Sequence, residues 1–137
     1  MKASTYLTFN GNCAEAITLY EKAFGVKAEI MRYKDAPETD GYIPPAGTDE
    51  FIMHAQFDIG GSTIMLCDVP PDMKFTFGNG IAIHAQLDDI KSIEKAFDIL
   101  KEGGKVMMKP QKTFWSACFG SLEDKFGVGF MLSLDCE

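Results

Sequence analysis

The sequence predicts an α+β protein in which one βαβββ module is used twice. The order strand, helix, strand, loop and hairpin runs through the first half of the chain and begins again near residue 80. Turn and cap residues recur with it, because Asn10 and Asp88, like Gly25 and Gly103, lie about 78 residues apart. A fixed period of this kind is typical of a repeated structural unit. We therefore expect one domain over residues 1–137, with modules at about 1–70 and 78–137.

The first module begins with a short β-like run that ends at the turn Asn10-Gly11-Asn12, which can cap a following helix. Apolar residues at helical spacing predict that helix over 13–24, and Gly25 stands where a left-handed cap belongs. Residues 34–50, which hold three prolines and several acidic residues, predict an exposed loop or lid. The strands of this module are expected at 6–9, 26–33, 51–58 and 62–68, the last two flanking a hairpin turn at Gly60-Gly61.

The second module repeats this order. Asp88 or Asp89 is expected to cap a helix that stops at Gly103-Gly104. One apolar stripe marks its buried face: Ile90, Ile93, Phe97 and Leu100. The strands are expected at 81–87, 105–108, 113–120 and 128–134.

Composition narrows the classes of partner. The chain is 46% hydrophobic and 24% charged, which is typical of a globular protein, and its net charge of −7 does not favour nucleic acid. No apolar run approaches the roughly 18 residues of a membrane span, and no signal segment is evident at the N-terminus, so we expect a cytoplasmic protein. The four cysteines are widely spaced and are expected to be free thiols: Cys13, Cys67, Cys118 and Cys136.

Five blocks of sequence, in a fixed order, cover nearly the whole chain outside residues 34–50. They are YLTFNGNCAEAITLYEKAFG, MHAQFDIGGSTIMLCD, GNGIAIHAQLDDI, GGKV and TFWSACFGSLEDKFGVGFML. Together they resemble the PhnB-like branch of the vicinal-oxygen-chelate superfamily, which has the glyoxalase and bleomycin-resistance fold. The resemblance implies mixed sheets that curl around a concave cavity and, commonly, a homodimer. It implies no single activity, because one fold hosts many functions.

The resemblance also implies where a metal would bind. In metal-using members of the superfamily the ligand positions fall on Ser4 or Thr5, Met65, Ala82 and Met131. Divalent transition metals are held by imidazole, carboxylate or thiolate groups, which a thioether, a methyl or a hydroxyl group does not replace. We therefore expect neither a metal nor another cofactor at this site.

Alternation along the strands separates a core face from a cavity face. The core face is expected to hold Leu7, Phe9, Ile64, Leu66, Ile83, Ala85, Leu87, Phe130, Leu132 and Leu134. The opposite face shares the parity of the implied ligand positions, and it is expected to line the cavity with Tyr6, Thr8, Met65, Cys67, His84, Gln86, Met131 and Ser133. This mixture of groups suits a small, partly apolar organic molecule.

Three further side chains complete the predicted cavity. His54 alternates with Ile52 and Gln56 on an inner strand, and we assign His54 and Gln56 to the lining. Trp115 is the only tryptophan, and it can serve either as a stacking wall or as ordinary packing. His84 can titrate near neutrality, so it is the candidate catalytic residue, with a merely hydrogen-bonded histidine as the alternative.

Three functions remain open at this point. The first is a PhnB-like protein that binds a small organic molecule without a metal. The second is a lyase, isomerase or dioxygenase of the glyoxalase superfamily that is assisted by His84 or depends on a metal. The third is a dimeric drug-sequestering resistance protein. The expected partners are a second copy of the chain and a small organic molecule, with no nucleic acid and no membrane.

Overall fold

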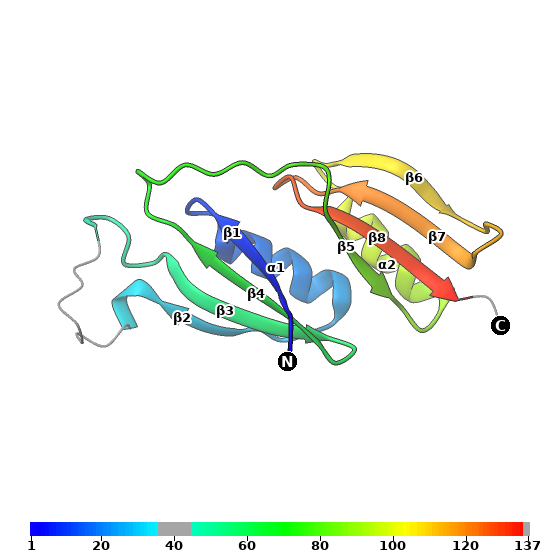
Figure 1. Ribbon diagram of the computed structural model, residues 1–137, viewed down its shortest axis with the longest axis horizontal. Coiled ribbons are helices and arrows are strands. Elements are labelled where there is room, and N and C mark those ends of the chain that lie inside the picture. The colour runs from blue at the N-terminus through cyan, green and yellow to red at the C-terminus, as the bar shows by residue number, and fades with distance from the viewer. Residues whose placement is uncertain (36–44, 136–137) are drawn as a thin grey trace. The chain divides into compact units, whose positions relative to one another are not determined.

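The computed structural model describes residues 1–35 and 45–135, and within them the α+β fold of two βαβββ modules is confirmed (Figure 1). The chain divides into two units, one formed by Met1–Glu21 with Val26–Phe75 and the other by Lys22–Gly25 with Thr76–Glu137. The first module contains β1 (Thr5–Phe9), α1 (Cys13–Phe24), β2 (Glu29–Arg32), a 3-10 turn η1 (Tyr33–Asp35), β3 (Ile52–Ile59) and β4 (Ser62–Asp68). The second contains β5 (Ala82–Gln86), α2 (Ile90–Leu100), β6 (Lys105–Gln111), β7 (Ser116–Glu123) and β8 (Gly129–Asp135).

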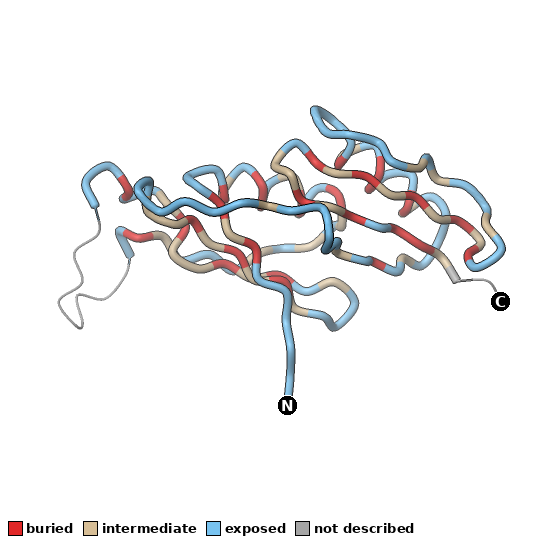
Figure 2. The backbone as a smooth tube through the Cα atoms, turned by 45° about the horizontal axis from the view of Figure 1, so that its top comes forward, coloured by how far each residue is buried: buried red, intermediate tan, exposed pale blue. Residues whose placement is uncertain are grey.

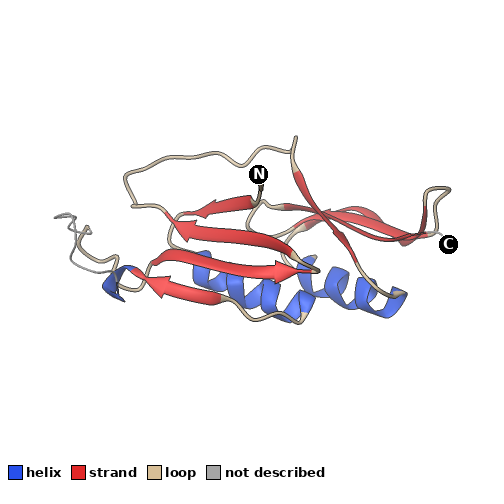
Figure 3. Ribbon diagram, turned by 60° about the horizontal axis from the view of Figure 1, so that its bottom comes forward, coloured by secondary structure: helices blue, strands red, loops and turns tan. Residues whose placement is uncertain are grey.

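The first sheet has the strand order β1-β4-β3-β2, in which β1 and β4 are parallel and the other pairs are antiparallel. Helix α1 covers one face of it (Figure 3), and the Tyr20 ring of α1 lies 6.2 Å from the Phe57 ring of β3. The predicted core residues of this sheet are all buried: Leu7, Phe9, Ile64 and Leu66. Burial therefore alternates along β1 and β4, as the sequence pattern predicts (Figure 2).

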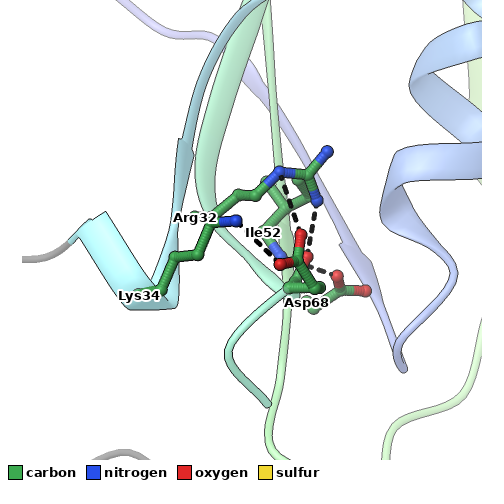
Figure 4. A network of polar contacts seen from close by, with 5 residues as sticks. Arg32, Lys34, Ile52 and Asp68 are labelled. Carbon is green, nitrogen blue, oxygen red and sulfur yellow. Dashed lines mark hydrogen bonds and ion pairs between the residues drawn. The ribbon is translucent and has the colours of Figure 1, made fainter.

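The buried carboxylate of Asp68 joins segments of the first module. Its Oδ1 accepts hydrogen bonds from the backbone N–H of Gly11 at 2.8 Å and of Cys13 at 3.0 Å. Its Oδ2 accepts from the backbone N–H of Ile52 at 2.9 Å (Figure 4), and the Tyr33 hydroxyl donates to the Asp68 carbonyl at 3.0 Å. Asp68 thus ties the start of α1 to β3 and β4, a role that the sequence analysis did not assign.

The second sheet has the equivalent order β5-β8-β7-β6, with β5 and β8 parallel. Helix α2 packs on β7, β8 and β6, and its N-cap is Asp89, whose side chain accepts from Ser92 N–H at 2.7 Å. Gly120 of β7 lies under the Phe97 ring, where an added Cβ would stand 3.2 Å from that ring. A larger residue there would displace α2 or the ring.

Several side chains depart from the predicted helix and core positions. Ile90 is 46% exposed because it is the first residue of α2, whereas the rest of the stripe is buried. Ile83, Leu87 and Leu134 are half-buried instead of fully buried. Among the cysteines that the structure describes, Cys13, Cys67 and Cys118 are free thiols as expected, and Cys136 lies outside the described residues.

The strand boundaries also differ in places. Strand β2 is shorter than the expected 26–33, since the backbone turns into η1 at Tyr33. Strand β6 is longer and includes Pro110. An edge strand tolerates a proline, which has no N–H to donate, because an edge strand has a ladder on one side only. Of the predicted loop at 34–50, residues 36–44 lie outside the described residues, and residues 45–50 form no helix or strand. No helix within the described ranges is long and apolar enough to cross a membrane.

Candidate functional site

The open face of the first sheet, opposite α1, carries the predicted lining residues of that module. In the parallel ladder Tyr6 pairs with Met65 and Thr8 with Cys67. Tyr6 is exposed and the other three are half-buried. Desolvation, together with a hydrogen bond to the Cys67 thiol, raises the pKa of Tyr6 to about 12. The phenol therefore stays protonated at neutral pH and acts as a hydrogen-bonding group, not as a base.

His54 and Gln56 of β3 are half-buried and belong to the same sheet. The His54 ring centroid lies 6.1 Å from that of Tyr6, with the planes tilted by 47°. The pairing between β2 and β3 shifts here, because Met31 pairs with His54 but Arg32 pairs with Ile52. This bulge breaks the simple alternation, and Ile52 is buried in the core instead of lying beside His54.

The open face of the second sheet presents His84 and Gln86 of β5 beside Met131 and Ser133 of β8, with which they pair in register. A hydrogen bond of 2.7 Å joins His84 Nε2 and Ser133 Oγ. Ser133 is only 5% exposed, whereas the imidazole is exposed. A buried hydroxyl thus orients an accessible ring, whose Nδ1 forms no hydrogen bond with any residue that the structure describes.

Each module carries one hydrogen-bonded pair of polar side chains at equivalent positions of its open face. Tyr6 pairs with Met65 and bonds to Cys67 two residues further along β4, while His84 pairs with Met131 and bonds to Ser133 two residues further along β8. The repeat therefore extends from the fold to the side chains of the open faces. His84 occupies in the second module the place that Tyr6 holds in the first.

A hollow of about 170 Å³ opens in the second unit, and one of its lining residues is Met131, the ladder partner of His84. It contains Ala82 and Met131, two of the positions at which the sequence resemblance places metal ligands. Its other main side chains are Asn79, Ile81, Met107, Ser121, Leu122, Glu123 and Phe130. Of the residues that line this hollow, only Met131 was predicted from the sequence as a cavity residue. Register shifts in β6 between Val106 and Met108 explain why Met107 could not be placed by counting along the strand.

Trp115 lies in the connection between β6 and β7. Its ring forms edge-to-face contacts with Phe114, at 4.7 Å between centroids, and with Phe119, at 5.5 Å. Phe119 pairs with Ser133 in the ladder, so the aromatic cluster adjoins the row of Ser133 and Gln86, which is next to the row that carries His84. Trp115 is 49% exposed and is thus available for stacking, and Phe119 is a neighbour that the sequence analysis missed.

The donor chemistry of the implied metal positions does not fit a divalent transition metal. Thr5 and Met65 lie in the first unit, Ala82 and Met131 in the second, and none offers imidazole, carboxylate or thiolate. Within residues 1–35 and 45–135 no group of three or more His, Cys, Asp or Glu side chains is arranged to hold a metal. The pair of histidines, His54 and His84, is divided between the two units.

Comparison with known proteins identifies the family. Residues 1–133 match the family model described as 3-demethylubiquinone-9 3-methyltransferase. Protein YjdN of Escherichia coli is 33% identical over 141 residues, a match that covers 98% of this chain and 95% of that protein. The chain belongs to the PhnB-like family.

Solved structures of this family agree with the fold. Protein PA1353 from Pseudomonas aeruginosa has a TM-score of 0.85 at 34% identity, with 100% of this chain and 99% of that chain covered. A Bacillus cereus PhnB protein, described as a putative 3-demethylubiquinone-9 3-methyltransferase, has a TM-score of 0.78 at 27% identity and covers 98% and 99% of the two chains. The two modules of this chain thus have the fold of these solved structures.

Proposed function

We propose that this PhnB-like protein binds a small organic molecule on the open face of its second sheet, with the hollow beside Met131 as the main subsite and without a transition metal. The observation that carries the proposal is the mainly apolar hollow of about 170 Å³ at Ala82 and Met131. Ligand sites are mostly apolar clefts with a few polar groups that set orientation. A cavity of roughly 150 Å³ is enough to hold benzene, so the hollow is large enough for a ligand with about one aromatic ring.

The neighbouring side chains supply the orientation that such a site needs. His84 lies next to Met131 in the sheet, and its ring is fixed by Ser133. Its exposed Nδ1 can donate to or accept from a ligand, depending on the tautomer. Trp115 offers an aromatic surface beside Phe119, which pairs in the ladder with Ser133, the hydrogen-bond partner of His84. A ligand longer than one ring would extend from the hollow across His84 towards this cluster.

The methyltransferase description of the family finds no support in the glycine turn of this chain. The run Asp58-Ile59-Gly60-Gly61-Ser62 is the hairpin between β3 and β4, with φ of +54° and +88° at the two glycines. Such a turn joins antiparallel strands. A Rossmann-type cofactor loop instead leads from a strand into a helix whose N-terminus holds the phosphates. We therefore derive no methyl transfer through this segment.

A second candidate function is acid/base catalysis by His84, as in a lyase or isomerase. The hydrogen bond to the buried Ser133 hydroxyl favours it, because it holds the imidazole in one orientation beside the hollow. An acid or base must be placed within hydrogen-bond reach of the proton that it moves. Turnover that is lost in His84→Gln while binding persists would establish this role. Stoichiometric binding without turnover would instead favour a sequestering protein.

The binding proposal is tested with a fragment library and a protein labelled at the methionine methyl groups. Bound fragments should shift the resonances of Met107 and Met131, and Met131→Ala should weaken their binding. Met65→Ala is the matched control, since Met65 holds the equivalent ladder position in the first sheet and should leave affinity unchanged. Fragments that shift only Met65, or a complete absence of shifts at Met107 and Met131, would contradict the proposal.

A further inference from the structure

Among the residues that the structure describes, a single charged residue lines the hollow of the second sheet, and it is acidic. Glu123, at the end of β7, is half-buried and lines the hollow together with Ser121 on the same strand. The remaining polar side chain is Asn79, and the other contacts come from apolar side chains and glycine. No lysine, arginine or histidine lines the hollow in the part of the chain that the structure describes.

Glu123 has no ion-pair partner within residues 1–35 and 45–135. Lys105 stands opposite it in the ladder between β6 and β7, yet none of the salt bridges between described residues involves Glu123. Lys125, two residues further on, lies over the Phe126 ring at 5.2 Å from its centroid. A half-buried carboxylate without an ion-pair partner is partly desolvated, and a cationic ligand would restore the interactions that it has lost with water.

We infer that the hollow recognises an organic cation, namely an amine with an apolar body of about one ring. This inference rests on the proposed function and names its ligand class. The ammonium group would donate to the Glu123 carboxylate, while the ring would pack between Ile81 and the thioethers of Met107 and Met131. Thioethers make favourable contacts with aromatic rings.

The net charge of the chain also favours a cationic ligand. A net charge of −7 raises the local concentration of cations and lowers that of anions around the protein. A carboxylate or phosphate ligand would meet Glu123 with like charge and would find no basic group in the hollow. An uncharged ligand would fill the apolar part but leave the carboxylate without a partner.

The experiment compares three probes of one shape and different charge. Benzylamine, benzyl alcohol and benzoate are titrated at pH 7 into protein labelled at the methionine methyl groups, with Met107 and Met131 assigned through M107L and M131L. Benzylamine should bind roughly fivefold more tightly than benzyl alcohol, the size expected for a partly exposed ion pair. Benzoate should bind more weakly than either.

Matched variants assign the preference to Glu123. Glu123→Gln should reduce the affinity for benzylamine to that for benzyl alcohol and leave the alcohol unchanged. Glu102→Gln removes an exposed carboxylate outside the hollow and should change neither affinity. Circular dichroism verifies that both variants are folded.

The possible failures are distinguishable. Equal affinities of the three probes, each shifting Met107 and Met131, would overturn the preference for cations and leave the proposed binding site intact. Preference for benzylamine that survives in Glu123→Gln would likewise overturn the role of this carboxylate. Shifts at neither methionine with any probe would overturn the proposed function itself.

Discussion

Asp68 is the carboxylate on which three backbone N–H groups, from two segments of the first module, converge. Asparagine is nearly the same size, but its amide can accept at only one of the two oxygen positions and would turn an N–H group towards a backbone donor. We expect Asp68→Asn to lower the free energy of unfolding by roughly 2–4 kcal/mol, since buried donors would lose a charged acceptor. Urea denaturation of both proteins gives this difference.

Asp72→Asn is the control for Asp68, because Asp72 is exposed and lies only four residues further along the chain. It should change stability by less than about 0.5 kcal/mol, as surface substitutions usually do. Similar losses in the two variants would show that the three backbone contacts contribute little.

The raised pKa of Tyr6 predicts that the folded protein loses stability at alkaline pH. Its pKa is raised to about 12 by desolvation and by its hydrogen bond to Cys67, whereas an unfolded tyrosine titrates near 10. Between these values the folded protein binds more protons than the unfolded one, so stability falls as the pH rises from 10 to 12. Burial also raises the pKa of the Cys13 thiol, which adds a decline that begins near pH 9.

Tyr6→Phe separates the two contributions. Urea denaturation at pH 8, 10 and 11 should show a shallower decline above pH 10 in this variant, with the decline due to Cys13 retained. An unchanged slope above pH 10 would mean that Tyr6 titrates normally in the folded protein.

The implied metal positions lead to a prediction at the level of donor atoms. Because Met65, Ala82 and Met131 offer no imidazole, carboxylate or thiolate, the purified protein should hold well under one transition metal per chain. Elemental analysis after expression in medium supplied with zinc, iron, nickel and manganese measures this ratio. Near-unit occupancy by any of these metals, with ligands on β1, β4, β5 and β8, would contradict the assignment.

At the scale of the element, strand β4 separates a core face from an open face. Leu66 is fully buried under α1, whereas Met65 is half-buried on the open face. Truncation of a buried leucine costs roughly 2–5 kcal/mol through lost burial and an unfilled cavity. Leu66→Ala should therefore destabilise the protein clearly more than Met65→Ala in denaturant titrations. Equal losses would mean that the two faces of β4 are buried alike.

The face on which a side chain lies could be predicted from the sequence where the strands are regular, but not where their register shifts. The parity of β1, β4 and β8 was predictable, since side chains alternate strictly on a paired strand. Ile52 broke the pattern at a bulge, and Met107 lies at the register shift between Val106 and Met108. Neither residue has a glycine or proline directly beside it to mark the irregularity in the sequence. Helix boundaries were easier, because a glycine with positive φ follows each helix: Gly25 comes directly after α1, and Gly103 comes three residues after the last residue of α2.

The candidate site was predictable only in part for a related reason. His84, Met131 and Ser133 lie on two strands whose faces could be assigned one strand at a time. Glu123 and Ile81 belong to the hollow because of which strands are neighbours, and the pairing of β5 with β8, which are far apart in the sequence, is not encoded in any local pattern. Asp68 was missed because its partners are 16 to 57 residues away in sequence.

At the scale of the whole molecule, apolar side chains remain at the surface of a single chain. Ile81 is 88% exposed and Phe114 is 94% exposed, and the two open sheets end in edge strands, β1 and β2 in one and β5 and β6 in the other. Exposed apolar residues and unpaired strand edges are typical of surfaces that a partner covers. A second copy of the chain is the partner that the family resemblance implies, so we expect a homodimer.

Light scattering coupled to size-exclusion chromatography measures the mass directly. It should give twice the chain mass of 15.1 kDa at micromolar concentrations. Phe114→Ser should shift the equilibrium towards the monomer if this ring is covered by the partner, because burying a large apolar side chain contributes roughly 1.5–3 kcal/mol. Lys112→Ser, a change of an exposed polar residue in the same connection, serves as the control. A monomeric mass of the unmodified protein throughout the micromolar range would contradict the dimer. The exposed aromatic side chains of the second module would then be explained by ligand binding alone.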